Sequence, residues 1–185
     1  MDVVGDAMRA VPRSGFLPRR DRWRARHDGP IQIGHGQTNS QPRTVEAMLR
    51  LLEVEPGQHV LDVGAGSGWT TALLAHLTGS SGSVVGVELV PELAEWGAAN
   101  LAGTAYDWAS IRPATPQVLG VPDDAPYDRI LVSAEASSMP QPLVDQLGDE
   151  GRLVVPVRGT MRLVVRRGEE TEVTQHGAYR FVPLR

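Results

Sequence analysis

Apolar positions recur with two alternating periods along the chain from Thr44 onwards. Segments with apolar residues three or four positions apart, which predict helices, alternate with short apolar runs, which predict buried strands. The predicted helices are 45–52, 70–77 and 91–101, and the predicted strands are 60–63 and 84–87, with a short strand around Ile111. Buried strands that alternate with helices form a parallel sheet covered on both sides. The pattern therefore predicts an α/β fold with a doubly wound, mostly parallel sheet.

The alternation continues to residue 157 and then stops. Residues 129–133 predict a fourth strand, residues 143–147 a helix and residues 153–157 a fifth strand. Beyond them, residues 162–166 and 179–184 are separated by a polar stretch without helical periodicity. Strands joined without a crossover helix pair antiparallel, so we expect an antiparallel strand pair to end the sheet. Because the length suits one domain and no linker interrupts the pattern, we expect residues 1–185 to form a single domain.

Residues 1–43 differ from this pattern. Apolar residues spaced as on one helix face occupy positions 3–11 and predict a short helix. An irregular arm follows, with five arginines and one tryptophan in the eight residues 19–26. Charge runs are usually solvated faces, so we expect no nucleic acid to bind there. Residues 31–42 are rich in glycine and in hydrogen-bonding side chains, and we interpret them as a loop that contacts a ligand.

Composition excludes several classes of chemistry. The chain has 41% hydrophobic and 22% charged residues, as globular proteins do. It has no cysteine, which excludes disulfides, thiolate metal sites and a cysteine nucleophile. Its five histidines are too far apart in sequence to form a paired metal-ligand motif, so we expect no metal ion. The sequence shows no apolar stretch of about 18 residues and no signal peptide pattern at residues 1–10. We therefore expect a cytoplasmic protein that does not bind membranes.

The predicted strand 60–63 runs directly into the turn Gly64-Ala65-Gly66-Ser67-Gly68, and a helix follows at once. This context is typical of nucleotide-binding sites, because glycine lets the backbone approach a ligand and a helix start presents unpaired N–H groups. The glycine spacing differs from the G-x-G-x-x-G of dinucleotide sites, and the G-K-S or G-K-T of a P-loop is absent. The turn predicts a nucleotide-like ligand of another kind.

Two acids narrow the choice of ligand. Asp62 stands two residues before the first glycine, and Glu88 ends the next predicted strand. A carboxylate beside the turn would repel a pyrophosphate, whereas S-adenosyl-L-methionine has no phosphate and carries an ammonium and a sulfonium group. Residues 51–111 contain seven acids and no basic residue, which agrees with a cationic ligand. Glu88 is placed to accept hydrogen bonds from both ribose hydroxyls. The two acids therefore favour S-adenosyl-L-methionine as the cofactor.

Four sequence blocks together resemble protein-L-isoaspartate O-methyltransferases. Residues 11–18 are similar to the family's V-P-R-x-x-F-x-P, and residues 33–42 are similar to its I-G-x-G-Q-T-x-S-Q-P. The turn at 60–68 and the C-terminal segments between 143 and 184 are the other two blocks. The resemblance implies a Rossmann-like methyltransferase fold, in which residues 1–43 form an N-terminal helix and a substrate-side arm and residues 44–185 form the cofactor-binding sheet.

The resemblance also implies an activity and a site. The activity is methyl transfer from S-adenosyl-L-methionine to a carboxylate of L-isoaspartyl residues in damaged proteins or peptides, with S-adenosyl-L-homocysteine as the product. Ser40 is implied as the active-site hydroxyl on the substrate side, with Thr38 beside it. The implied cofactor-binding residues are Asp62, Gly64, Ala65, Gly66, Ser67, Glu88 and Leu89. We expect isoaspartyl proteins or peptides as partners and a monomeric enzyme.

The chain departs from the family's pattern where a Gly-Asp-Gly usually follows the third strand. Residues 114–117 read Ala-Thr-Pro-Gln instead, so a carboxylate and a backbone N–H on the adenine side are missing. A non-catalytic homologue with an impaired cofactor site is therefore one alternative. A second is a related enzyme that methylates Asp in a dedicated peptide, whose acidic leader the arginine-rich arm would bind. A nucleic-acid methyltransferase would need an N/D-P-P-Y-like motif after the fourth predicted strand. Residues 133–136 stand at this place and read Ser-Ala-Glu-Ala.

Overall fold

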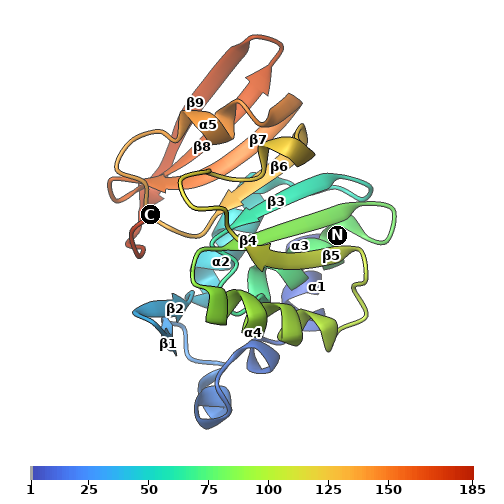
Figure 1. Ribbon diagram of the computed structural model, residues 1–185, viewed down its shortest axis with the longest axis vertical. Coiled ribbons are helices and arrows are strands. Elements are labelled where there is room, and N and C mark those ends of the chain that lie inside the picture. The colour runs from blue at the N-terminus through green and yellow to red at the C-terminus, as the bar shows by residue number, and fades with distance from the viewer. Residues whose placement is uncertain (1) are drawn as a thin grey trace.

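The computed structural model describes residues 2–185, which form one large and one small β-sheet (Figure 1). The large sheet has seven strands in the order β5-β4-β3-β6-β7-β8-β9, and the small sheet pairs β1 with β2. The strands are β1 (Ile31–Gly34), β2 (Gln37–Asn39), β3 (His59–Val63), β4 (Ser83–Glu88), β5 (Ala109–Pro113), β6 (Tyr127–Val132), β7 (Leu147–Val157), β8 (Thr160–Arg167) and β9 (Glu170–Ala178). The helices are α1 (Val3–Ala10), α2 (Pro42–Leu52), α3 (Trp69–Thr78), α4 (Pro91–Ala102) and α5 (Gln141–Val144), with short 3-10 helices η1 (Arg13–Phe16), η2 (Arg19–Arg24) and η3 (Pro122–Asp124).

The strand order explains where a ligand site can form. Strands β3 to β7 run parallel, and β8 and β9 continue the sheet antiparallel. From β3 the chain builds outwards through β4 to β5, and then returns to place β6 on the other side of β3. Open α/β sheets bind ligands at the carboxyl ends of the strands where the order reverses. The predicted doubly wound, mostly parallel sheet with an antiparallel pair at its end is confirmed.

The central strands are buried on both faces because successive side chains point to opposite sides. Val60 packs in an apolar cluster with residues of α1, α2 and α3, whereas Leu61 packs in a second cluster with residues of α5. Nine of the ten residues of α3 are buried, so this helix is apolar nearly all round. Within residues 2–185, no helix is long and apolar enough to cross a membrane.

The segment predicted as a ligand-contacting loop contains a β-hairpin. Strands β1 and β2 pair antiparallel, with a register shift between Gln32 and Gly34. Ile31 and Ile33 are buried while Gln32 and Gly34 are exposed, so the alternation typical of a strand is present but only four residues long. The prediction of irregular structure was wrong because the polar and glycine-rich residues around the turn masked this short alternation.

Two further boundaries differ from the prediction. Helix α5 ends at Val144, so the helix predicted at 143–147 was misplaced, and Leu147 begins β7. The last strand is β9, which covers the polar stretch, and not residues 179–184. Eight of the nine residues of β9 are polar or small, and most are exposed. An edge strand exposed on both faces needs no apolar alternation, which is why its sequence gave no strand signal.

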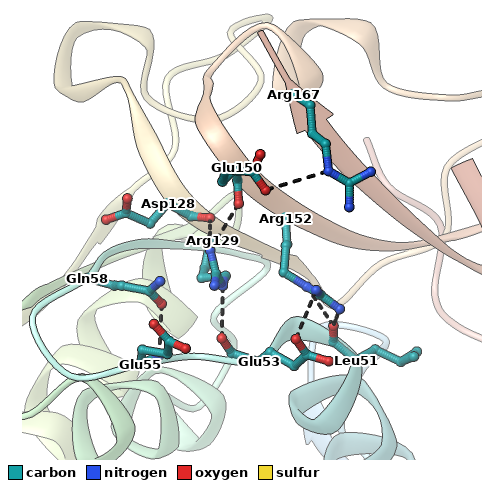
Figure 2. Close-up of polar contacts among 9 residues, drawn as sticks. All are labelled: Leu51, Glu53, Glu55, Gln58, Asp128, Arg129, Glu150, Arg152 and Arg167. Carbon is teal, nitrogen blue, oxygen red and sulfur yellow. Dashed lines mark hydrogen bonds and ion pairs between the residues drawn. The ribbon is translucent and has the colours of Figure 1, made fainter. Parts of the chain in front are cut away.

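Two arginines on neighbouring strands hold the C-terminal end of α2 (Figure 2). Arg129 on β6 and Arg152 on β7 are register partners. Arg129 Nε donates to the Glu53 carbonyl at 3.0 Å, and Arg152 Nη2 donates to the Leu51 carbonyl at 2.8 Å. Carbonyl groups at a helix C-terminus lack partners within the helix, and nearby cations are favoured there. The arginines therefore fix α2 against the sheet at the end opposite Ser40, which precedes the helix.

Candidate active site

A cavity of about 590 Å³ lies at the carboxyl ends of β3, β4 and β6. This volume is within the range of small-molecule sites. Eight of the predicted site residues line the cavity: Thr38, Ser40, Gly64, Ala65, Gly66, Ser67, Glu88 and Leu89. The cavity therefore joins the turn predicted to bind the cofactor with the hydroxyls predicted to face the substrate. Asp62 is the one predicted site residue that does not line it.

The first and the third glycine of the turn serve different purposes. Gly64 and Gly66 have φ angles of +83° and +53°, which side chains other than glycine rarely adopt. A Cβ atom on Gly64 would lie 3.8 Å from Ser133, an ordinary contact distance, so the positive φ and not a clash favours glycine there. A Cβ atom on Gly68 would lie only 2.8 Å from the Gly97 carbonyl of α4. The first glycine therefore provides the backbone conformation of the turn, and the third permits α4 to pack against it.

Glu88 connects the glycine turn to the start of α4. Its side chain is buried at the end of β4, where Oε2 accepts the Gly66 N–H at 2.9 Å and Oε1 accepts the Val90 N–H at 2.9 Å. Each carboxylate oxygen has a second lone pair free for another donor. Glu88 is also the only carboxylate side chain among the described residues that line the cavity. It can therefore accept ribose hydroxyls while it holds the turn in place.

Asp62 lies beneath the turn and not in the wall of the cavity. Its side chain is fully buried on β3, and Oδ2 accepts the hydroxyl groups of Thr70 and Thr71 at 2.9 and 2.7 Å. Burial, with a smaller contribution from the charge of Glu88, raises the pKa of Asp62 to about 6. Asp62 Oδ1 is buried without a hydrogen-bond partner within residues 2–185, and the contact of Asp62 with the methionine end of the cofactor stays a prediction. Through Oδ2, Asp62 also fixes the start of α3 behind the turn.

Ser40 follows strand β2, and a buried arginine fixes the backbone around it. The Arg13 guanidinium donates to the Ser40 carbonyl at 2.8 Å and to the Asn39 carbonyl at 2.9 Å. Arg13 Nε donates to Asn39 Oδ1 at 2.6 Å, and Asn39 Nδ2 donates to Ser67 Oγ at 3.0 Å. These contacts connect the segment of Ser40 directly to the glycine turn at 64–68. The hydroxyls of Ser40 and Thr38 share the same cavity.

Arg13 itself is buried among carbonyl groups. Two further bonds, to the His27 and Gly29 carbonyls at 2.9 Å each, give its guanidinium five contacts with oxygen atoms. The guanidinium also lies 5.6 Å from the centre of the Trp69 ring. Burial lowers the pKa of Arg13 to about 10, so it remains charged at neutral pH. The motif V-P-R contained Arg13, but no local pattern indicated that it would position Ser40.

Ser133 is a second residue without a predicted role. It follows β6 and lines the cavity, and its hydroxyl is buried without a hydrogen-bond partner in the described part of the chain, residues 2–185. A Cβ atom on Gly64 would lie 3.8 Å from the Ser133 side chain, so the two residues face each other across the turn. Buried polar atoms normally have partners. The Ser133 hydroxyl is therefore available to a polar group of a ligand bound at this turn.

The wall of the cavity fits the predicted cofactor. Apolar side chains that can cover an adenine ring lie on the β4 and β5 side, at Leu89, Ala114, Pro116 and Leu119. Glu88 offers acceptors for ribose hydroxyls, and Ser133 offers an unused hydroxyl near Gly64. The set contains both the apolar surface and the few polar groups that such a ligand needs. Among residues 2–185, no group of three or more histidine or acidic side chains is placed to hold a metal ion.

Comparison with known proteins places the chain in a family. The family model for Protein-L-isoaspartate(D-aspartate) O-methyltransferase matches residues 1–185. A protein-L-isoaspartate O-methyltransferase from Methanocella arvoryzae is 43% identical over 182 residues, which cover 96% of this chain and 95% of the relative. The same enzyme from Methanopyrus kandleri is 44% identical over 186 residues, 98% of this chain and 82% of the relative.

A solved structure agrees with these sequence matches. It is a Plasmodium falciparum protein proposed to be a protein-L-isoaspartate O-methyltransferase, in complex with S-adenosyl-L-homocysteine. Its TM-score to this chain is 0.88 at 26% sequence identity, and the match covers 100% of this chain and 91% of the other. The predicted resemblance is confirmed along the whole length of the sequence. The chain therefore belongs to the protein-L-isoaspartate(D-aspartate) O-methyltransferase family.

Proposed function

We propose that the protein transfers a methyl group from S-adenosyl-L-methionine to the free carboxylate of L-isoaspartyl residues in damaged proteins or peptides. One observation carries this proposal: the glycine turn, Glu88 and Ser40 all line a single cavity. A methyl donor and a methyl acceptor bound at these two places would meet inside it. Membership of the family supports the identity of both.

The donor side is formed by residues of the sheet. The turn at 64–67 and Glu88 would hold the ribose and methionine parts, and the apolar residues around Leu89 would cover the adenine. When bound, S-adenosyl-L-methionine supplies a methyl group on a positively charged sulfur. The carboxylate of Glu88 favours such a cation. The carboxylate lost from residues 114–117 leaves Glu88 as the main polar contact for the nucleoside.

The acceptor side is formed by the hairpin and the loop after it. A carboxylate with a pKa of about 4 is already ionised at neutral pH, so no general base is required to activate it. The Ser40 hydroxyl can donate one hydrogen bond that orients the carboxylate without removing its charge. Thr38 lies beside it on β2. The contribution of the protein is therefore alignment of the two groups and exclusion of water.

The direct test is methyl transfer to matched peptides. Two peptides of the same sequence, one with an isoaspartyl and one with an aspartyl residue, are incubated with methyl-labelled S-adenosyl-L-methionine. We expect base-labile label on the isoaspartyl peptide only, because the product is a methyl ester. Label on the aspartyl peptide alone would instead indicate the related activity toward Asp in a dedicated peptide.

Calorimetry with S-adenosyl-L-homocysteine separates the remaining alternative. A homologue with an impaired cofactor site would give no binding, whereas the proposed enzyme binds the product at the turn. Ser40 and Thr38 as substrate-side residues, a cytoplasmic location and a monomeric state stay predictions. Size-exclusion chromatography with light scattering tests the last of these.

A further inference from the structure

The arginine-rich arm has no part in the core. Helix η2 contains no buried residue, and the Trp23 side chain is 82% exposed. Arg19, Arg20, Arg22 and Arg26 are also exposed. We call the residues Arg19, Arg20, Arg22, Trp23, Arg24 and Arg26 the basic arm.

Most of the positive charge of the basic arm is unused within the protein. Asp21 is its only acidic residue, and it pairs with Arg20 at 3.4 Å and with Arg24 at 3.2 Å. No ion pair is present for Arg19, Arg22 or Arg26 within residues 2–185. Arg22 Nε donates to the Leu17 carbonyl at 3.5 Å, and the arm presents its remaining guanidinium donors beside one exposed indole ring. Guanidinium groups bind carboxylates in a bidentate geometry.

The basic arm leads directly to the substrate-side loop. Arg13 binds the His27 and Gly29 carbonyls at 2.9 Å each, and the same guanidinium binds the Ser40 carbonyl at 2.8 Å. Asp28 Oδ2 pairs with Arg43 at 2.6 Å. The residues that follow the arm are thus fixed against residues 40–43. Figure 1 shows the same arrangement, with the blue N-terminal coils below the β1–β2 hairpin and far from β9.

The charge distribution selects the kind of partner. The whole chain carries a net charge of −4 and residues 19–26 carry +4, so the rest of the chain carries −8. A nucleic acid long enough to bind tightly would extend over this acidic remainder, and each further phosphate would be repelled. A short acidic peptide segment can pair with the arm alone. The residues that follow the arm are bound to the segment of Ser40 through Arg13, so the arm suits a part of the substrate that flanks the methylated residue.

We propose that the basic arm binds acidic residues of the polypeptide substrate that flank its isoaspartyl residue. This inference rests on the proposed function, because it names the substrates that the enzyme prefers. Exposed ion pairs are individually weak, so several of them together account for a preference of about 10-fold in KM. The arm contacts flanking residues only, so kcat stays the same.

The test uses three isoaspartyl peptides that differ only in the flanking residues, which are glutamate, serine or lysine. For the wild-type protein we expect KM for the glutamate peptide to be about 10-fold below KM for the lysine peptide, with equal kcat and with a smaller difference in 0.5 M NaCl. In the variant Arg22→Glu/Arg26→Glu residues 19–26 carry no net charge, so the difference between the two KM values should be lost. The control Arg9→Glu/Arg167→Glu, with the same change in net charge away from the arm, should keep the wild-type preference.

Two results would overturn the inference. The first is equal KM values of the wild-type protein for the glutamate and lysine peptides, and the second is a preference for the glutamate peptide that persists in the arm variant. Methylation of none of the peptides contradicts the proposed function instead. In that case fluorescence anisotropy of the labelled glutamate peptide still tests the arm, because binding should weaken in the arm variant and not in the control. Tighter binding of a single-stranded oligonucleotide than of the glutamate peptide, lost in the arm variant, would assign the arm to nucleic acid and overturn the inference.

Discussion

Replacement of Arg13 should reveal how strongly the substrate-side loop depends on one buried guanidinium. Arg13 is 4% exposed and contacts five oxygen atoms from four residues, at distances between 2.6 and 2.9 Å. Within residues 2–185 no carboxylate forms an ion pair with it, so carbonyl and amide oxygens compensate its charge. The substitution Arg13→Lys keeps the charge but has three donors on one nitrogen atom, which cannot reach acceptors spread around a planar fork.

The expected loss can be estimated from these contacts. A lysine would leave at least two of the five acceptors without a donor, and hydrogen bonds to charged groups contribute about 1.5 to 3 kcal/mol each. We therefore expect Arg13→Lys to lower the free energy of unfolding by about 3 kcal/mol. For a domain of this size that corresponds to a decrease in Tm of roughly 6 to 12 °C. Arg13→Met should cost more, because every acceptor then loses its donor.

Differential scanning calorimetry measures the change in Tm, with Arg19→Lys on the exposed arm as the matched control. Folded Arg13→Lys protein should also show a higher KM for an isoaspartyl peptide, with a smaller change in KM for S-adenosyl-L-methionine. Stability alone would change neither constant at a temperature where the variant is folded. A Tm within 1 °C of the wild type would refute the role assigned to Arg13.

Three other substitutions test single contacts of the site. Ser40→Ala should lower kcat for methylation of an isoaspartyl peptide by roughly 10- to 150-fold, because one hydrogen bond to a charged group is lost. The affinity for the cofactor, measured by calorimetry, should stay unchanged, and a wild-type kcat would remove Ser40 from the acceptor site. Glu88→Ala should weaken S-adenosyl-L-methionine binding at least about 10-fold in calorimetry, since it loses the ribose acceptors and the support of Gly66; unchanged affinity would contradict its assignment. Burial raises the pKa of Asp62 from 3.8 to about 6, so the wild-type protein loses stability as the pH rises through about 6. The free energy of unfolding of Asp62→Asn, measured in urea, should therefore gain up to about 3 kcal/mol relative to the wild type between pH 4 and pH 7. A difference that does not change with pH would contradict the raised pKa.

The strands that the sequence predicts well are those buried on both faces. Four of the five residues of β3 are buried, and three of these four are apolar, so its sequence indicates a buried strand in spite of Asp62. Strand β9 has the opposite environment, because it is an edge strand paired only with β8. Its polar sequence is compatible with a strand, a loop or a linker. Only the pairing with β8 decides among these, and this pairing is not visible in β9 itself.

The same distinction applies to the site. The glycine turn could be predicted because a positive φ at Gly64 is a local property, which the residue type reveals. The hydroxyl of Ser40 has no local signature, and only the resemblance to a family indicated its role. Asp62 shows the limit of spacing: it stands two residues before the turn, yet the strand directs its side chain behind the turn. Sequence distance to a ligand site does not fix the face to which a side chain points.

Contacts between the N-terminal segment and the sheet determine how donor and acceptor are aligned. Asn39 bonds Ser67 of the cofactor turn at 3.0 Å, and the Trp69 ring nitrogen donates to the Val11 carbonyl at 3.0 Å. Ser67 belongs to the turn that follows β3, and Trp69 is the first residue of α3. A displacement of about 1 Å between reacting groups can cost about 100-fold in rate. The turn and the start of α3 therefore also hold the N-terminal segment, and Ser67 and Trp69 make these contacts while they are buried in the wall of the cavity.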